Sequence, residues 1–328
     1  MAYEFRLGEL KRKHLRRIAM QQLRKLRALL DDASDTALGH HQARRSIKRL
    51  RALLSLAMPL AGTKRWRKLD ARLGEVARQL AGRRDAAVML QVLKALGERH
   101  GAGSLGETGA RLQEALQVRS RQAGHQVDLD LASRRLKKVQ RGFKTLDLRE
   151  FGRKSVFRQV ASDYRAGRIA LTRAYRKQHA DDFHALRKMV QRHWRHMQLF
   201  ALVWPQEMQV RVDRARELSD ILGDDHDLWV LRLTLRNGVA EWLDPAAANT
   251  LDALCRKDQA ELRAKAQPLL AQLFAERPTA LRKRLSAYWG TASEHGAIGA
   301  HGRSQRVSPP VRAGARRSRP ASPERSAE

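Results

Sequence analysis

The chain has 328 residues, and its 66 lysines and arginines outnumber its 34 aspartates and glutamates by enough to give a formal net charge of +32. Such a positive balance indicates a polyanionic partner, and a hydrophobic content of 42% is sufficient for a sizeable folded core. A single cysteine excludes an intramolecular disulfide framework, and no run of about 18 apolar residues is present to span a membrane.

The first half of the chain predicts a series of helices. Residues 9–30 place leucines and isoleucine on one face and lysines and arginines on the other, and DDASD (31–35) ends this helix. A second helix contains residues 40–54 and ends near Pro59. Further helices are expected over 63–80, 86–100 and 107–125, with AGRRD (81–85) as a turn, and a short helix over 130–141.

The second half predicts the same plan. Helices are expected over 151–179, 181–200 and 206–222, then a break at GDDHD (223–227), a helix from LWVLRL onward, and helices over 245–274 and 278–289. Few stretches alternate with a period of two, so the fold class is all-α with essentially no sheet. From residue 290 to 328 the composition is rich in Gly, Ser, Pro and Arg, which is typical of a disordered basic tail.

The segment HHQARRSIKRLRALL (40–54) forms an amphipathic helix with an almost purely cationic polar face. At about 100° per residue, Arg44, Arg45, Lys48 and Ala52 lie within about 60° of His41, and Arg49 and Arg51 flank this stripe. The apolar residues Ala43, Ile47, Leu50, Leu53 and Leu54 lie on the opposite face. An ordinary basic surface helix is one interpretation, but like charges one turn apart repel, so a bound anion would stabilise this helix.

The chain also contains a weak internal duplication at a spacing of about 141–143 residues. HQARRSIKRLRALL (41–54) aligns with HALRKMVQRHWRHM (184–197), which pairs His41 with His184 and Arg49 with Arg192. The second stripe comprises His184, Arg187, Lys188, Gln191 and Arg195. His193 falls on the apolar side and is interpreted as a core or interface histidine. The two stripes are therefore expected to face one shared groove or pore, which an anion would fill.

A second pair of repeated motifs follows, LAGRRDAAVML (80–90) and LGDDHDLWVL (222–231). Asp85 and Asp227 are interpreted as N-caps of the apolar helices that follow, although either could instead orient a histidine or arginine of a neighbouring helix. Asp224, Asp225, His226 and Asp227 form a compact acidic cluster, for which a metal site is a weak alternative.

These motifs resemble the CHAD family, the conserved histidine α-helical domain. The resemblance rests on HQxRxxIKRLRALL, LAGxRD, the second HxLRK and LSDxLGDxxD, and it covers roughly residues 1–289 in two halves, about 1–142 and 143–289. Glu75 stands where the family pattern has a basic residue, whereas Arg216 matches its basic position. The resemblance implies two pseudo-symmetric four-helix bundles around a basic groove or channel. It further implies an inorganic polyphosphate ligand, localisation to polyphosphate granules and no catalysis.

The candidate ligand contacts are all cations or histidines, and no catalytic residue, metal ligand or cofactor is expected. The first set comprises His41, Arg44, Arg45, Lys48, Arg49, His184, Arg187, Lys188, Arg192 and Arg195. A second set on adjoining helices comprises Lys64, Lys68, Arg72, Arg78 and Arg216.

Three alternative functions follow from the same composition. Non-specific nucleic-acid binding is the main competitor, but single strands need aromatic platforms, and only Trp66 and Trp194 lie close to the stripes. An enzyme acting on phosphates would need a P-loop, paired carboxylates or an activated nucleophile, and no GxxxxGK[ST] motif occurs. Membrane-surface binding is disfavoured because the apolar helix faces form a core. The N-terminal sequence has no apolar signal region, so the cytoplasm is expected.

Overall fold

The computed structural model describes residues 3–8, 10–31, 37–80, 82–101, 106–123, 129–238 and 245–302, and within these ranges all regular secondary structure is helical. The first half contains α1 (Arg12–Asp31), α2 (Ala37–Ser55), α3 (Met58–Ala61), α4 (Thr63–Gln79), α5 (Gly82–His100), α6 (Gly106–Ala123) and α7 (Leu129–Thr145). The second half contains α8 (Arg153–Lys177), α9 (Ala180–Leu199), the short 3₁₀ helix η2 (Ala201–Val203), α10 (Pro205–Gly238), α11 (Pro245–Leu273) and α12 (Pro278–Gly302). The predicted all-α class is confirmed.

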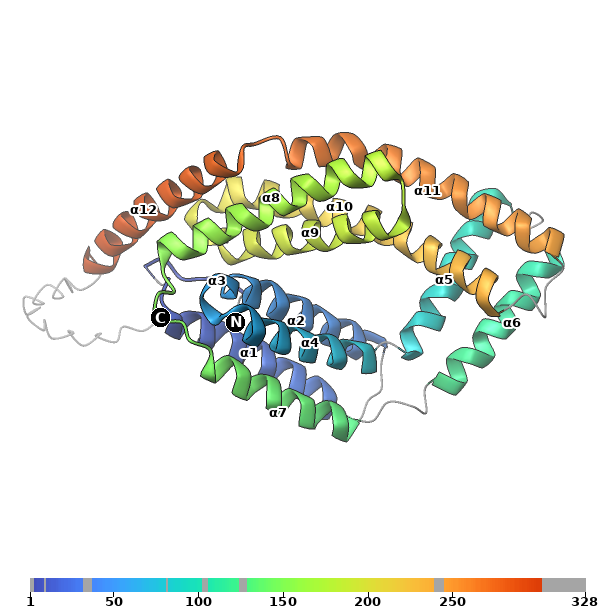
Figure 1. The fold of residues 1–328 in the computed structure, drawn as a ribbon, viewed down its shortest axis with the longest axis horizontal. Coiled ribbons are helices and arrows are strands. Elements are labelled where there is room, and N and C mark those ends of the chain that lie inside the picture. Colours follow the sequence, from blue (N-terminus) through green and yellow to red (C-terminus); the bar gives the residue numbers. More distant parts are fainter. Residues whose placement is uncertain are drawn as a thin grey trace, which may run out of the picture.

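The internal duplication is visible in the order of the helices. In Figure 1, α1, α2, α4 and α7 form one bundle, and α8, α9, α10 and α12 form a second bundle beside it. In chain order α8 corresponds to α1, α9 to α2, η2 to α3, α11 to α6 and α12 to α7, while α10 takes the places of both α4 and α5. Two pseudo-symmetric four-helix bundles, as predicted, therefore make up most of the fold.

Two hydrophobic clusters hold the helices together. The larger cluster runs through both bundles and includes Phe5, Phe157 and Phe200, whose rings contact one another where the two halves meet. The smaller cluster joins α5 and α6 to the distal part of α10 and to α11, and it contains Leu231 and the buried Cys255. Figure 1 shows this α5–α6 hairpin beside the far ends of α10 and α11, at a distance from the bundles.

The predicted break at GDDHD (223–227) is wrong, because α10 continues through it as one helix from Pro205 to Gly238. Apolar residues spaced three to four apart persist on both sides of the motif, with Leu218 and Leu222 before it and Leu231 after it, all buried. This continuous apolar stripe outweighs the helix-breaking tendency of a single glycine, which costs about 1 kcal/mol. Asp227 therefore lies inside a helix and is not an N-cap.

The N-cap role predicted for Asp85 is also wrong, since α5 already begins at Gly82. The segment 81–85, predicted as a turn, is helical from Gly82 onward, and Ala81 lies outside the described residues. The first half nevertheless has two helices here, α4 and α5, whereas the second half has the single continuous helix α10.

Two helices are longer than their predicted bounds. The short helix expected over 130–141 extends over the whole of α7 to Thr145. The helical part of the chain does not end at residue 289, because α12 reaches Gly302. Adding residues to an existing helix needs no new nucleation, so both helices continue past the residues whose apolar spacing predicts them. The remainder of the predicted tail, 303–328, lies outside the described residues.

None of the described helices combines the length and the apolar character that crossing a membrane demands.

Candidate functional site

Helix α2 has the two faces that its sequence predicts. Ala43, Ile47, Leu50, Leu53 and Leu54 are all buried. On the other face His41 and Arg45 are exposed, and Arg44, Lys48 and Arg49 are half-buried. Nη2 of Arg45 donates a hydrogen bond to Nε2 of His41 at 3.2 Å, one helical turn away, because a guanidinium can only donate. The cationic stripe is thus a physical feature of the folded helix.

The two histidine helices cross at their C-terminal ends. Nε2 of His196 on α9 lies 3.0 Å from Oγ of Ser55 and 3.1 Å from the carbonyl oxygen of Ala52, and all of these groups are buried. Ser55 Oγ itself donates to the Ala52 carbonyl at 2.7 Å. Ala52, which the helical spacing places on the same side of α2 as the cationic stripe, is buried because α9 packs on it. The stripe of α2 therefore ends where α9 crosses.

Beyond this crossing, α9 and α10 bring two histidines together. The rings of His184 and His226 stack with centroids 4.3 Å apart, and the ring of Trp229 lies 5.6 Å further along from His226. Arg187 packs against α10 at Gly223, where a Cβ atom would lie 3.3 Å from the guanidinium. Glycine at this position therefore allows the guanidinium to approach the helix closely.

Cations from both halves of the chain act on this histidine pair. Burial, together with the charges of Lys188 and Arg187, lowers the pKa of His184 to about 4. Burial lowers the pKa of His226 to about 3, and the cations that reinforce this shift include Lys48 of α2. Both imidazoles are accordingly neutral at pH 7 and lie within a positive potential that α2 and α9 produce jointly.

The lysine of the second stripe is affected in the same way. Burial lowers the pKa of Lys188, and the positive charge of Arg51 on α2 lowers it further. Arg51 itself forms a bidentate ion pair with Asp70 of α4, with both N–O distances 2.7 Å. Charges of α2 are therefore close enough to α9 to act on its lysine.

Arg49 and Arg195 form the most enclosed part of this basic region. Arg195 is only 5% exposed, and its guanidinium lies over the ring of Trp194 at 3.6 Å from the centroid. Burial, together with the charge of Arg49, lowers the pKa of Arg195 to about 10. The Nε atoms of both arginines are buried and find no hydrogen-bond acceptor among the described residues. Unsatisfied buried donors beside like charges favour the binding of an anion.

Two residues of α9 lie away from the shared face. Arg192 donates to Asp163 of α8 at 3.0 Å, so it belongs to an internal ion pair and is not brought together with the stripe. His193 is 4% exposed and lies against the rings of Tyr164 and Phe274, with centroids 5.3 and 6.1 Å away. The interpretation of His193 as a core histidine is confirmed.

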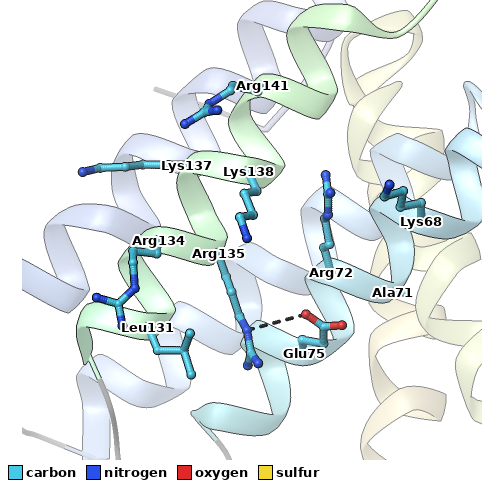
Figure 2. Close-up of a pocket in the computed structure, with 10 residues that line it drawn as sticks. All are labelled: Lys68, Ala71, Arg72, Glu75, Leu131, Arg134, Arg135, Lys137, Lys138 and Arg141. Carbon is cyan, nitrogen blue, oxygen red and sulfur yellow. Dashed lines mark ion pairs between the residues drawn. The ribbon is translucent and has the colours of Figure 1, made fainter.

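The second set of candidates is divided between two surfaces. Lys68 and Arg72 of α4 line a groove of about 620 Å³ against α7 (Figure 2). Lys64 and Arg78 lie exposed on the same helix. Arg216 is exposed on α10 and lies 3.9 Å from Asp220, its partner one turn later. The structure thus brings two of these five residues together in a groove.

The acidic cluster at 224–227 is dispersed by the continuous helix, because successive residues point about 100° apart. Asp225 is buried and accepts from Arg263 of α11 at 2.6 Å, whereas Asp224 and Asp227 line a pocket against α5 and His226 stacks on α9. Within the described residues, no group of three histidine, cysteine or acidic side chains is arranged to hold a metal. These four residues therefore have separate structural roles.

Sequence reasoning missed two features of the basic surfaces. His226 was assigned to the acidic cluster, and its place beside His184 follows only once α10 is continuous. The cations of α7 that line the groove were not proposed as contacts; they are Arg134, Arg135, Lys137, Lys138 and Arg141. The basic run RRLKK (134–138) was the signal available for them in the sequence.

Comparisons with known proteins agree with this architecture. The chain resembles a structure described as PptA from Streptomyces chartreusis, with 18% sequence identity, a TM-score of 0.58, and coverage of 82% of this chain and 100% of that one. It also resembles the crystal structure of the CHAD domain from the plant Ricinus communis, with 18% identity, a TM-score of 0.60, and coverage of 84% and 94%. At this identity the likeness concerns the fold. No curated protein matches the sequence. The CHAD domain profile matches residues 15–236, which is more than half of the chain, and the protein therefore belongs to the CHAD family.

Proposed function

We propose that this protein is a non-catalytic receptor for inorganic polyphosphate, which it binds between the facing stripes of α2 and α9. The observation that carries the proposal is the convergence of Lys48, Arg187 and Lys188, from two halves of the chain, around the stacked pair His184 and His226. Converging like charges repel each other, and a chain of phosphates passing between them would remove that repulsion. Membership of the CHAD family supports inorganic polyphosphate as the ligand.

The residue types suit a ligand made only of phosphates. Arginine presents a planar fork to phosphate oxygens, lysine presents a point charge, and a neutral histidine presents one donor. A polyphosphate chain offers acceptors along its whole length and has no bases that require stacking or edge recognition. The cellular setting that follows from this ligand is the cytoplasm, with recruitment to polyphosphate granules.

Nucleic acid is the alternative that a test must exclude. Nε1 of Trp66 donates to the Leu54 carbonyl at 3.2 Å, and the ring of Trp194 is covered by Arg195, so neither is an open stacking platform. The stacked rings of His184, His226 and Trp229 are the aromatic feature that an unpaired base could extend. Single-stranded DNA is therefore the most informative competitor.

The experiment compares long-chain polyphosphate with single-stranded and duplex DNA at about 0.15–0.3 M salt, where weak phosphate contacts are screened. The full chain and a truncation after Gly302 are both measured, because α12 reaches that residue. We expect polyphosphate to bind at least tenfold more tightly than either DNA, with the preference retained in the truncated protein. Equal affinities, or a preference that disappears with the tail, would instead favour a generic electropositive surface.

Binding is expected to strengthen as the pH falls from 7 towards 4. The free-protein pKa values of His184 and His226 are about 4 and about 3. A bound polyanion would raise both values, so protons would be taken up on binding between the free and the bound pKa. In the free protein the charges of Lys188 and Arg187 lower the pKa of both histidines, and Lys48 also lowers that of His226. Asp181 acts in the opposite direction on the pKa of His184. The affinity gain is at most about tenfold per pH unit for each histidine.

Dissociation constants at several pH values and constant ionic strength would measure this effect. The double variant His184→Gln/His226→Gln is expected to bind with a flatter pH profile. An unchanged profile in the double variant would assign the proton uptake to other groups.

A further inference from the structure

The groove between α4 and α7 has a volume of about 620 Å³, and most of its lining residues are cations. Figure 2 shows Arg135 and Lys138 of α7 directed towards α4, where Arg72 and Glu75 lie opposite. Arg134, Lys137 and Arg141 continue the positive charge along the outer side of α7. The groove does not include the α2 and α9 stripes, because none of its described lining residues belongs to either helix. Helix α4 contacts α2 through other residues, among them Asp70, which pairs with Arg51.

The charge of this groove is not balanced within the described protein. Glu75 is the one carboxylate among the lining residues, and it lies 3.6 Å from Arg135. No ion pair among the described residues involves Lys68, Arg72, Arg134, Lys137, Lys138 or Arg141. Six positive charges on two adjoining helices repel one another, and the packing of the helices does not relieve this.

The close contact of α4 and α7 fixes these charges in place. Gly142 of α7 lies so close to Leu69 of α4 that a Cβ atom would be 2.7 Å from the leucine side chain. Leu69, Leu73, Val139 and Phe143 are all buried in the same cluster. The cations are therefore held on a rigid scaffold, as a binding site requires.

The corresponding surface of the second half is neutralised. One repeat length after Lys68, Arg72 and Glu75, α10 carries Val210, Arg214 and Glu217. Arg214 donates to Glu217 at 2.7 Å. On α12, the counterpart of α7, Arg284 pairs with Glu207 at 3.3 Å and with Glu276 at 2.6 Å. These second-half arginines are therefore paired with carboxylates, whereas the six groove cations of the first half are not, within the part of the chain that the structure describes.

From this asymmetry we infer that the α4–α7 groove is a second binding site for linear polyphosphate, separate from the α2–α9 site. The inference rests on the proposed function and adds a site to it. The groove has aliphatic stems and cationic heads, and none of its lining residues is aromatic, so it offers a phosphate chain contacts and an unpaired base no platform. A second groove continues the basic surface over α7 towards α1, through Lys137, Lys144 and Arg24.

The triple variant Arg72→Gln/Lys138→Gln/Arg141→Gln tests this site. Long-chain polyphosphate is expected to bind at least tenfold more weakly, and the slope of log affinity against log salt should fall by about 2, as for three lost phosphate contacts. The matched control is Lys154→Gln/Arg158→Gln/Arg165→Gln, which removes one lysine and two arginines from the exposed face of α8. The control is expected to change the affinity by no more than about twofold.

A lysine footprint by chemical acetylation and mass spectrometry locates the ligand directly. Long-chain polyphosphate should protect Lys68 and Lys138 from acetylation and should leave Lys154 reactive. If the wild-type protein binds polyphosphate but the groove variant matches the α8 control and Lys138 is not protected, the second site is refuted and the proposed function stands. If the wild-type protein binds no polyphosphate, both are refuted.

Glu75 supplies a test in the opposite direction. Its replacement by glutamine removes the counter-charge of Arg135 and frees that guanidinium for phosphate, so Glu75→Gln is expected to tighten polyphosphate binding by about threefold or more. Glu217→Gln is the matched control, because Glu217 also pairs with an arginine and its side chain is 45% exposed against 39% for Glu75. Equal effects of the two substitutions would contradict a site in the groove.

Discussion

Replacing Arg44, Arg45 and Lys48 with glutamate is expected to weaken polyphosphate binding by at least about a thousandfold. Each hydrogen bond to a charged group contributes about 1.5–3 kcal/mol, and three of them exceed the 4 kcal/mol that corresponds to a factor of a thousand. The substitution also places negative charges beside Arg187 and Lys188, which would pair with them in place of the ligand. The substitution should therefore raise the dissociation constant by more than the loss of three contacts alone.

The fold of this variant should remain intact, because its three residues lie on the polar face of α2 while Ile47, Leu50 and Leu53 remain buried. Circular dichroism should show unchanged helicity, and isothermal titration with long-chain polyphosphate measures the affinity. The control reverses the same number of charges on α8, at Lys154, Arg158 and Arg165, which are all exposed. A similar loss in the control would mean that net charge alone determines binding. Unchanged affinity in the α2 variant would remove the stripe from the site.

The fold was largely predictable because its helices are amphipathic and locally encoded. The apolar residues assigned to the core side of α2 are buried, and Pro245 begins α11 as its position predicts. The errors occur where a local signal opposes a longer periodicity. At GDDHD, glycine and aspartate indicate a helix end, but the apolar spacing from Leu218 to Leu231 continues and tertiary packing determines the outcome.

The candidate site was predictable only in part, because one helix does not specify what its neighbours supply. Arg192 and Arg195 lie on the same helix as His184, but Arg192 pairs with Asp163 of α8 and Arg195 is enclosed beside Trp194. The position of His226 beside His184 depends on the continuity of α10 through GDDHD, where the sequence predicts a break. The α4–α7 groove joins segments far apart in the chain, so neither basic run indicated it alone.

Helix packing also determines the hydrogen bonding of His193 and His196, two buried histidines of α9 near its crossing with α2. His196 donates from Nε2 to the Ala52 carbonyl across the two halves, whereas Nε2 of His193 is buried and has no hydrogen-bond partner among the described residues. Burial lowers the pKa of both residues, and that of His193 falls to about 3. The fold therefore accommodates both side chains in the neutral form, which makes its stability sensitive to acid.

Stability is expected to fall as the pH drops below about 6.5. Above that pH His193 is neutral in both the folded and the unfolded chain, so it contributes no pH dependence. Below it the unfolded chain binds a proton that the folded chain excludes until the pH reaches about 3. The free energy of unfolding should therefore decrease by as much as about 4–5 kcal/mol from this residue, since each pKa unit corresponds to about 1.4 kcal/mol.

The variant His193→Phe isolates this contribution. Phenylalanine cannot be protonated, and its ring is suited to the aromatic surroundings that Tyr164 and Phe274 provide. Its unfolding free energy at pH 7.5 should equal or exceed that of the wild-type protein, because within the part of the chain that the structure describes Nε2 of His193 makes no hydrogen bond that would be lost. Urea unfolding at pH 7.5 and pH 4.5 should then show a clearly smaller acid loss in the variant than in the wild type. Equal losses in both proteins would assign the acid sensitivity to other groups. The next residue to substitute would then be His196, which is buried at the crossing of α2 and α9.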